Sequence, residues 1–323
     1  QLLVDLIPSA EMVRFGKNGT DVTSAAIRLA RAYTGKNEVA VCGYHGWQDW
    51  YIGTTSRDLG VPSQVKSLSH TFKYNDIQSL ESLFSKTNEI AAVIMEPMSS
   101  EFPKHDFLKK VRDICTKHGA ILIFDEMITG FRLDLGGAQS LFGVTPDLST
   151  FGKGMANGMP ISALVGRRDI MEKMEDIFFS GTFGGETLSL ASAKATINKM
   201  IEFDVPKYFE EIGGYLNNGI QLTIDALGID WLKLTGHDSW KILNIDAGDQ
   251  TLLYKSILIQ ELLSQGVLTI GTHNVSLAFK REHADEVISA YSHVLTNMND
   301  HIKDDTLHSL LQGQMLKPVF KVR

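Results

Sequence analysis

Two residue types that could do chemistry together, an aspartate and a lysine, stand 28 positions apart in this sequence. Asp125 follows directly after the apolar run Ala120–Phe124. Lys153 lies between two glycines in the turn-forming segment Ser149–Pro160. A lysine amine can form an imine with a carbonyl carbon, and a carboxylate can keep the nitrogen of a pyridine ring protonated. An acid at a strand end and a lysine in a glycine-rich turn are therefore what pyridoxal phosphate chemistry needs.

Each of these two residues also has an ordinary interpretation. A carboxylate at a strand end often caps the next turn, and a loop lysine is commonly exposed to solvent. In the catalytic interpretation, Asp125 favours a protonated ring that accepts electrons from the substrate. Lys153, once released from the cofactor, is then the base that moves protons between the substrate carbon and the cofactor carbon. Gly152 and Gly154 allow a bulky cofactor to approach the backbone.

A third segment, Asn18-Gly19-Thr20, precedes a helix that we expect to begin near Thr23. Backbone N–H groups, the helix dipole and the threonine hydroxyl together suit a phosphate group. The same residues also form a good turn and helix cap, so this segment alone leaves both interpretations open.

Strands and helices alternate along the first two hundred residues, which predicts an α/β fold with a mostly parallel sheet and crossover helices. We expect helices at Ser24–Tyr33, Ile77–Phe84, Phe107–His118 and Leu188–Glu202, and strands at Glu38–Cys42, Ile90–Met95, Ala120–Phe124 and Ile161–Val165. Ligands of open α/β sheets bind beyond the carboxyl ends of the strands. Tyr44 and His45, Glu96, and Asp125 each follow a predicted strand and should therefore converge on one site.

A domain boundary is expected near residue 203, because Gly213 and Gly214 begin a new pattern. We assign residues 1–203 to a large cofactor-binding domain and residues 204–323 to a smaller C-terminal α/β domain. Its expected elements are the segments Trp231–Thr235, Lys241–Ile245 and Val275–Phe279 and the helices Leu252–Gln265 and Ala284–Met298.

Composition limits the classes of function. The 323 residues are 43% hydrophobic, carry a formal net charge of −7 and contain no lysine- or arginine-rich block, which argues against a nucleic-acid partner. No apolar run reaches the roughly 18 residues of a membrane span, so no membrane partner is expected. Cys42 and Cys115 lack the spacing of a disulfide framework or a zinc site, so we expect no metal and a reducing, cytoplasmic compartment.

Six short segments, in order between about Val13 and Ala193, resemble the class-III aminotransferases of pyridoxal-phosphate fold type I, including the glutamate-1-semialdehyde aminomutase branch. The segments are Gly16–Thr20, Gly43–Gly46, Glu96–Pro97, Asp125–Arg132, Gly152–Gly154 and Ser180–Gly185. Each segment alone is a weak signal, but their common order is specific. The resemblance implies fold type I: a mostly parallel central sheet flanked by helices and a smaller C-terminal α/β domain.

The resemblance also implies pyridoxal 5'-phosphate as cofactor and gives roles to several residues. Tyr44 is similar to the aromatic residue that stacks on the ring, with Met127 on the opposite face where relatives usually have valine. Glu96 resembles the glutamate near the cofactor or the substrate amine, and the segment from Asn18 to Thr20 matches a phosphate contact. His45 is a further candidate. Core packing for Tyr44, a turn role for His45 and a surface carboxylate for Glu96 stay open as alternatives.

Thr182 resembles the threonine that reaches the phosphate of the neighbouring subunit's cofactor, which implies a homodimer with shared active sites. A glycine-rich loop before a helix is the alternative interpretation. Many relatives have Asn-Pro where this chain has Glu186-Thr187, which puts the substrate-side contacts in doubt. Family members usually carry a substantial segment before the equivalent of Gln1, so an N-terminal segment is expected to be missing here.

The expected activity is an aminotransferase that moves an amino group from a small-molecule amino donor to a carbonyl acceptor through a Lys153 Schiff base. A glutamate-1-semialdehyde-type aminomutase, which moves the amino group within one substrate, uses the same core residues. A non-catalytic pyridoxal-phosphate-binding or assembly protein is a third hypothesis, although such a protein needs no nucleophilic lysine. Substrate identity does not follow from the sequence.

Overall fold

The computed structural model of the chain describes residues 1–317. These residues form two compact units, one made of residues 1–99 and 103–204, the other of residues 100–102 and 205–317. The division into domains 1–203 and 204–323 stays a prediction. No helix among residues 1–317 combines the length and the apolar character needed to span a membrane.

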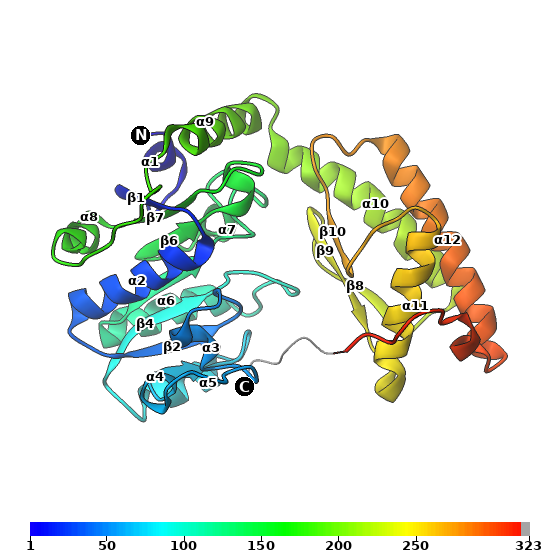
Figure 1. The fold of residues 1–323 in the computed structure, drawn as a ribbon, viewed down its shortest axis with the longest axis horizontal. Helices are drawn as coiled ribbons and strands as arrows, with labels where there is room; N and C mark the ends of the chain where they lie inside the picture. The colour runs from blue at the N-terminus through cyan, green and yellow to red at the C-terminus, as the bar shows by residue number, and fades with distance from the viewer. Residues whose placement is uncertain (318–323) are drawn as a thin grey trace. The chain divides into compact units, whose positions relative to one another are not determined.

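The larger unit is built on a seven-stranded sheet in the order β1-β7-β6-β5-β4-β2-β3 (Figure 1). Strands β6, β5, β4, β2 and β3 pair in parallel, whereas β7 runs antiparallel to both β1 and β6. The expectation of a mostly parallel sheet is therefore confirmed. The strands are β1 Met12–Gly16, β2 Glu38–Cys42, β3 Ser69–Thr71, β4 Ile90–Met95, β5 Ile121–Asp125, β6 Leu148–Phe151 and β7 Ser162–Gly166.

Helices of the larger unit confirm the helical expectations and add several short elements. They are α1 Leu2–Leu6, α2 Gly19–Thr34, α3 Asp49–Ile52, α4 Ser63–Lys66, α5 Ile77–Phe84, α6 Phe107–His118, α7 Ala138–Phe142, α8 Arg168–Met171 and α9 Thr187–Glu202, with 3-10 turns at Lys153–Met155 and Glu172–Glu175. Helix α2 begins at Gly19 rather than near Thr23. Asn18 and Asp21 form a capping box at its start, which satisfies the first backbone N–H groups and lengthens the helix toward its N-terminus.

Helices cover both faces of this sheet. Val41 and Ile94 point to the face that α2 covers, whereas their neighbours Ala40 and Val93 point to the face that α5 and α6 cover. All six residues of β4 are buried, as in a central parallel strand enclosed on both sides. Close packing on both faces gives the strand ends that carry the site a rigid base.

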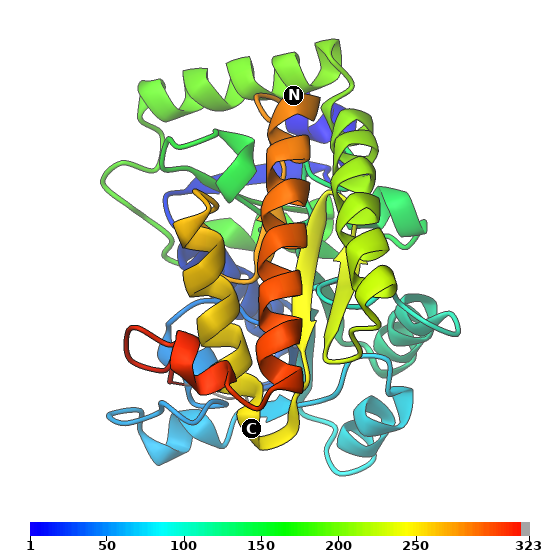
Figure 2. The same ribbon diagram turned by 90° about the vertical axis from the view of Figure 1, so that its right-hand side faces the viewer.

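The smaller unit has a three-stranded antiparallel sheet, in the order β10-β9-β8, with three long helices. Figure 2 shows α12 lying between α10 and α11, with which it makes contact. The elements are α10 Val205–Leu227, β8 Leu232–His237, β9 Trp240–Ile245, α11 Thr251–Ser264, β10 Thr272–Asn274 and α12 Arg281–Lys303, with 3-10 turns at Gly248–Gln250 and Leu307–Leu310.

Two expectations for this unit were wrong. Gly213 and Gly214 lie inside α10 and do not begin a new pattern. Position 213 needs a glycine because a side chain there would collide with the backbone of Asp238 in the β8–β9 turn. The segment Val275–Phe279 is not a strand. Strand β10 ends just before it, and the chain turns there, with the Phe279 N–H donating to the Ser276 oxygen, before α12 begins.

Candidate active site

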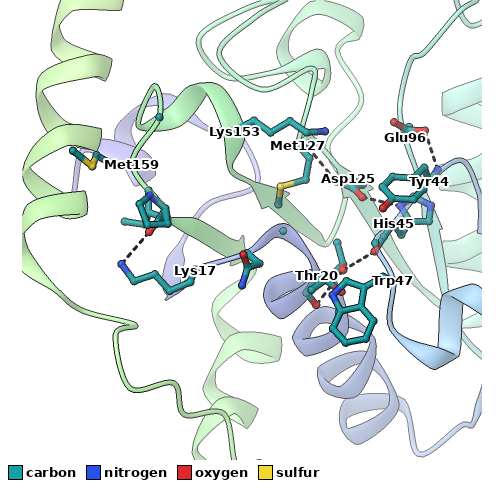
Figure 3. Close-up of a pocket in the computed structure, with 17 residues that line it drawn as sticks. Lys17, Thr20, Tyr44, His45, Trp47, Glu96, Asp125, Met127, Lys153 and Met159 are labelled. Carbon is teal, nitrogen blue, oxygen red and sulfur yellow. Dashed lines mark hydrogen bonds and ion pairs between the residues drawn. The ribbon is translucent and has the colours of Figure 1, made fainter. Parts of the chain in front are cut away.

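A pocket of about 550 Å³ lies at the carboxyl ends of the neighbouring strands β2, β4 and β5 (Figure 3). Nine of the ten cofactor-binding residues that the sequence predicts line this pocket; Thr182 does not. The convergence of the three strand ends is therefore observed. The lining residues are Lys17, Asn18, Gly19, Thr20, Thr23, Tyr44, His45, Gly46, Trp47, Glu96, Asp125, Met127, Lys153, Gly158, Met159, Pro160 and Ile161.

Asp125, the last residue of β5, is 3% exposed and held by three partners. Its Oδ1 accepts from the Met127 N–H and the Thr150 hydroxyl, both at 3.2 Å. Its Oδ2 lies 2.7 Å from Nδ1 of His45. These contacts fix the carboxylate in one orientation, as a group that must face a ring nitrogen requires.

His45 is buried behind Asp125, and the geometry constrains where its protons lie. Its Nε2 is 3.1 Å from the Cys42 carbonyl oxygen, which can only accept, so Nε2 carries a hydrogen. A proton must also lie between Nδ1 and the Asp125 carboxylate, because two facing lone pairs 2.7 Å apart would repel each other. The interpretation of His45 as a mere turn residue is therefore incomplete, since it orients Asp125.

Lys153 begins a 3-10 turn directly after β6, with a left-handed backbone at φ +42°. A lysine in this region stores local strain, which the surrounding structure must hold in place. Figure 3 shows its side chain extending past Met127 toward Asp125. Strain at a pocket lysine is typical of a functional position.

The segment before α2 forms a small cup of polar groups. Asp21 Oδ2 accepts from the backbone N–H groups of Lys17 and Asn18, at 3.1 and 2.8 Å. The Thr20 hydroxyl is buried and has no hydrogen-bond partner among the described residues. A buried hydroxyl without a partner is costly, and at a helix N-terminus it suits an oxygen of a bound phosphate.

Gly46 makes room for this hydroxyl and was not among the predicted site residues. Its φ of +108° is left-handed, and a side-chain carbon there would lie 2.7 Å from Thr20 Oγ1. The neighbouring His45 carbonyl accepts from the Thr23 hydroxyl at 3.0 Å, which ties this turn to α2. A glycine within the predicted Gly43–Gly46 motif was the available signal.

Met127 lies against two glycines of the pocket. A side-chain carbon at Gly19 would stand 3.0 Å from the Met127 sulfur, and one at Gly152 would stand 2.8 Å from it. Tyr44 is half exposed, and in the view of Figure 3 it lies on the other side of Asp125 from Met127. A flat ring between Tyr44 and Met127 would be packed on both faces.

Glu96 follows β4 and lines the pocket, so it is not a surface carboxylate. Its Oε2 accepts from the Tyr44 N–H at 3.0 Å. Burial raises the pKa of the Glu96 carboxyl; the nearby His45 opposes this rise, and Asp125 adds to it.

Thr182 is exposed, in the turn before α9, and does not line the pocket of its own chain. Lys17 lines the pocket but was not predicted as a site residue, because the segment Gly16–Thr20 was assigned to the phosphate through Asn18, Gly19 and Thr20 alone. Among residues 1–317 no cluster of three or more histidine, cysteine, aspartate or glutamate residues suits a metal ion.

The fold and the arrangement of these residues agree with the pyridoxal-phosphate fold type I that the sequence predicts. The family model for class-III aminotransferases matches residues 1–295. The chain belongs to the class-III aminotransferase family, whose cofactor is pyridoxal 5'-phosphate.

Two relatives illustrate the range of activities in this family. A glutamate-1-semialdehyde 2,1-aminomutase of Syntrophobacter fumaroxidans is 40% identical over 246 residues, which are 70% of this chain and 57% of the relative. A 3-aminobutyryl-CoA aminotransferase of Cloacimonas acidaminovorans is 35% identical over 295 residues, 88% of this chain and 70% of the relative. This chain thus spans little more than half the length of the aminomutase.

Solved structures resemble the fold closely. The PLP internal aldimine form of the FumI protein of Sphingopyxis sp. MTA144 has a TM-score of 0.85 at 27% identity, covering 96% of this chain and 77% of that chain. An omega-transaminase from Sphaerobacter thermophilus has a TM-score of 0.84 at 25% identity, covering 91% and 76%.

Proposed function

We propose that this chain carries the catalytic centre of a pyridoxal-phosphate-dependent aminotransferase, which moves an amino group from an amino donor to a carbonyl acceptor. One observation carries the proposal: the Lys153 amine, the buried Asp125 carboxylate and the unpartnered Thr20 hydroxyl line a single pocket. The amine would bond to the carbonyl carbon of the cofactor, the carboxylate would face its ring nitrogen, and the hydroxyl would bind its phosphate.

The chain's own residues divide the work of holding the cofactor. Asn18, Gly19 and Thr20 hold the phosphate at the start of α2. Tyr44 and Met127 pack on the two faces of the ring.

Asp125 and Lys153 then control the protons. When bound, pyridoxal phosphate supplies a ring that withdraws electrons from the carbon bearing the amino group. Asp125 holds a proton on the ring nitrogen, and His45 holds Asp125 in place. The Lys153 amine would take a proton from the substrate carbon that bears the amino group and deliver it to the aldehyde-derived carbon of the cofactor.

The decisive experiment traps the lysine. Borohydride reduction of the purified, yellow protein should add a pyridoxyl mass at Lys153, located by peptide mass spectrometry. Lys153→Ala serves as the matched control and should gain no such mass. A colourless protein without the adduct would contradict the catalytic proposal and favour the non-catalytic binding or assembly hypothesis.

An aminomutase is the second candidate, and the 40% identity to a glutamate-1-semialdehyde aminomutase favours keeping it. Both activities use Lys153 and Asp125, so the residues of the pocket do not separate them. Incubation with an amino donor and no acceptor separates the two activities. A keto product formed in the same amount as pyridoxamine phosphate supports the aminotransferase, whereas an isomerised amine without keto product supports the aminomutase.

We also propose a homodimer with shared active sites. Thr182 is exposed in the turn before α9, away from the pocket of its own chain, which leaves it accessible to a second copy. Exposed apolar side chains next to it, Phe183 at 64% and Leu188 at 63%, would be covered in such a dimer.

The proposed compartment is the cytoplasm, and the proposed partners are small molecules, not nucleic acid or membrane. Cys42 and Cys115 are both free and buried, and burial raises the pKa of each thiol to about 12. Free thiols without disulfides suit a reducing compartment.

A further inference from the structure

Lys17 joins the cup at the start of α2 to two other segments through a single ammonium group, and one of them, at Pro160, also lines the pocket. Its backbone precedes Asn18, where the cup before α2 begins. Its Nζ donates to the Pro160 carbonyl oxygen at 2.9 Å, to Glu186 Oε1 at 2.7 Å and to the Ser189 hydroxyl at 3.3 Å. Figure 3 shows the side chain reaching away from Thr20 toward the loop that contains Met159.

The loop that Lys17 holds is the one that carries Lys153. Residues 152–161 connect β6 to β7, and three of them have left-handed backbones: Lys153 at φ +42°, Asn157 at +47° and Gly158 at +110°. Such a loop does not keep its shape without external contacts. Two of the contacts that hold it are hydrogen bonds, the one from Lys17 to Pro160 and the one from the Ser192 hydroxyl to the Ala156 oxygen at 2.9 Å. Met155, Ala156 and Ile161 of the loop also pack in the core.

Glu186 in turn holds the Lys17 ammonium in place. It caps α9 by accepting from the Leu188 and Ser189 N–H groups at 2.8 and 3.0 Å. The hydrogen bond from Lys17 is the main reason why the pKa of the Glu186 carboxyl falls to about 2. Lys17 therefore has a charged partner near neutral pH and does not act as a free cation toward substrate.

We infer that Lys17 is a positioning residue, which couples the place of the cofactor phosphate to the place of the Lys153 amine. The inference rests on the proposed function, because it requires a cofactor that bonds to Lys153. Its ammonium links the cup at the start of α2 to the Lys153 loop and to the start of α9. These links set the distance between the cup, which would hold the cofactor phosphate, and the Lys153 amine, which would bond to the cofactor. A reacting group misplaced by an ångström reacts much more slowly even when binding survives.

The test uses the whole chain, freed of cofactor and then mixed with pyridoxal phosphate, while the visible absorbance of the lysine-bound form is followed by stopped flow. Lys17→Met should slow formation of the bond between Lys153 and pyridoxal phosphate about tenfold, because the Lys153 loop loses its hydrogen bond to Lys17. Affinity for pyridoxine 5'-phosphate, which has the phosphate but no aldehyde, should change less than about threefold. Lys17→Arg, which keeps the charge and the donors, should recover the rate to within about threefold of the wild type.

Arg14→Met is the matched control. Arg14 lies on β1 and donates to the Phe179 oxygen at 3.1 Å, so it also ties a cation to the segment before α9, but it does not line the pocket. Its loss should leave the rate within about twofold of the wild type. An equal slowing in Arg14→Met, an unchanged rate in Lys17→Met or no recovery in Lys17→Arg would overturn the inference. If the wild type itself forms no bond at Lys153, the proposed function fails first, and the two failures are thereby distinguished.

Discussion

Nδ1 of His45 and Oδ2 of Asp125 lie 2.7 Å apart, and both side chains are almost fully buried. Because the second ring nitrogen of His45 is held by the Cys42 carbonyl, the imidazole cannot turn away from the carboxylate. The acid that we propose to face the cofactor ring is thus itself oriented by a second buried group. His45 lies behind Asp125, one layer deeper in the protein than the residues that we propose to contact the cofactor.

Replacing His45 should lower turnover without removing the cofactor. His45→Asn loses the bond to Asp125, and a hydrogen bond to a charged group contributes about 1.5–3 kcal/mol, so the turnover number should fall about 10–100-fold. Steady-state kinetics and cofactor absorbance measure the two effects. His45→Gln reaches further than asparagine and is the milder control; unchanged turnover in His45→Asn would show that Asp125 is oriented without it.

Lys153→Ala should abolish turnover while leaving the fold intact. The Lys153 side chain is exposed in the pocket, so the substitution removes no core contact, and the melting temperature should change by only a few degrees, roughly the effect of 0.5 kcal/mol. Thermal unfolding of the cofactor-free protein and a turnover assay give the two readings. Retained turnover would reject the assignment of Lys153 as the catalytic base.

Thr20→Val should have opposite effects on affinity and on stability. The change removes a buried hydroxyl without a partner, so the cofactor-free protein should unfold at the same or a higher temperature. Loss of the phosphate contact should weaken cofactor binding about tenfold, measured by fluorescence titration.

The matched control for Thr20→Val is Thr23→Val, whose hydroxyl donates to the His45 oxygen. That variant should lose about 1 kcal/mol of unfolding free energy. Weaker stability in Thr20→Val with unchanged cofactor affinity would mean that this hydroxyl has no role in the phosphate site.

Glu96→Gln should become relatively more stable as the pH rises. The folded protein raises the pKa of Glu96, so the wild type loses unfolding free energy as the pH rises from the ordinary glutamate value through the raised one. The variant cannot ionise there and lacks this loss, so its melting temperature minus that of the wild type should increase between pH 4 and pH 8. The exposed Glu172→Gln is the control, and a difference that is flat or falls with pH would contradict the expectation.

Mixing two inactive or weakened variants should restore activity if the sites are shared. A dimer of one Lys153→Ala chain and one Thr182→Ala chain contains one site with both native residues, contributed by different subunits. After unfolding and refolding together, the mixture should be more active than either variant alone. No recovery, in a mixture shown by mass photometry to contain mixed dimers, would contradict the shared site.

Much of this site was predictable because its residues follow strands that periodicity identifies. β2 and β4 are apolar runs with the expected bounds, and the residues after them, Tyr44 and Glu96, reach one pocket because these strands are neighbours. The segment Val275–Phe279 has the same apolar character but forms a turn. A short apolar run predicts that a segment is buried. Whether its backbone is an extended strand or a turn depends on the packing around it.

Local sequence patterns were enough to pick out the candidate residues along the chain: an acid at the end of β5, a lysine in a glycine-rich loop, and a polar cup at the start of α2. Local patterns suffice for this, because strand ends and helix starts depend on neighbouring residues. The groups that position these residues became visible in the three-dimensional packing. Lys17 lies 143 residues before Pro160 and 169 before Glu186, and Asp125 lies 80 residues after His45. Such contacts depend on how β1, β2, β5 and α9 pack, and no local pattern records that packing.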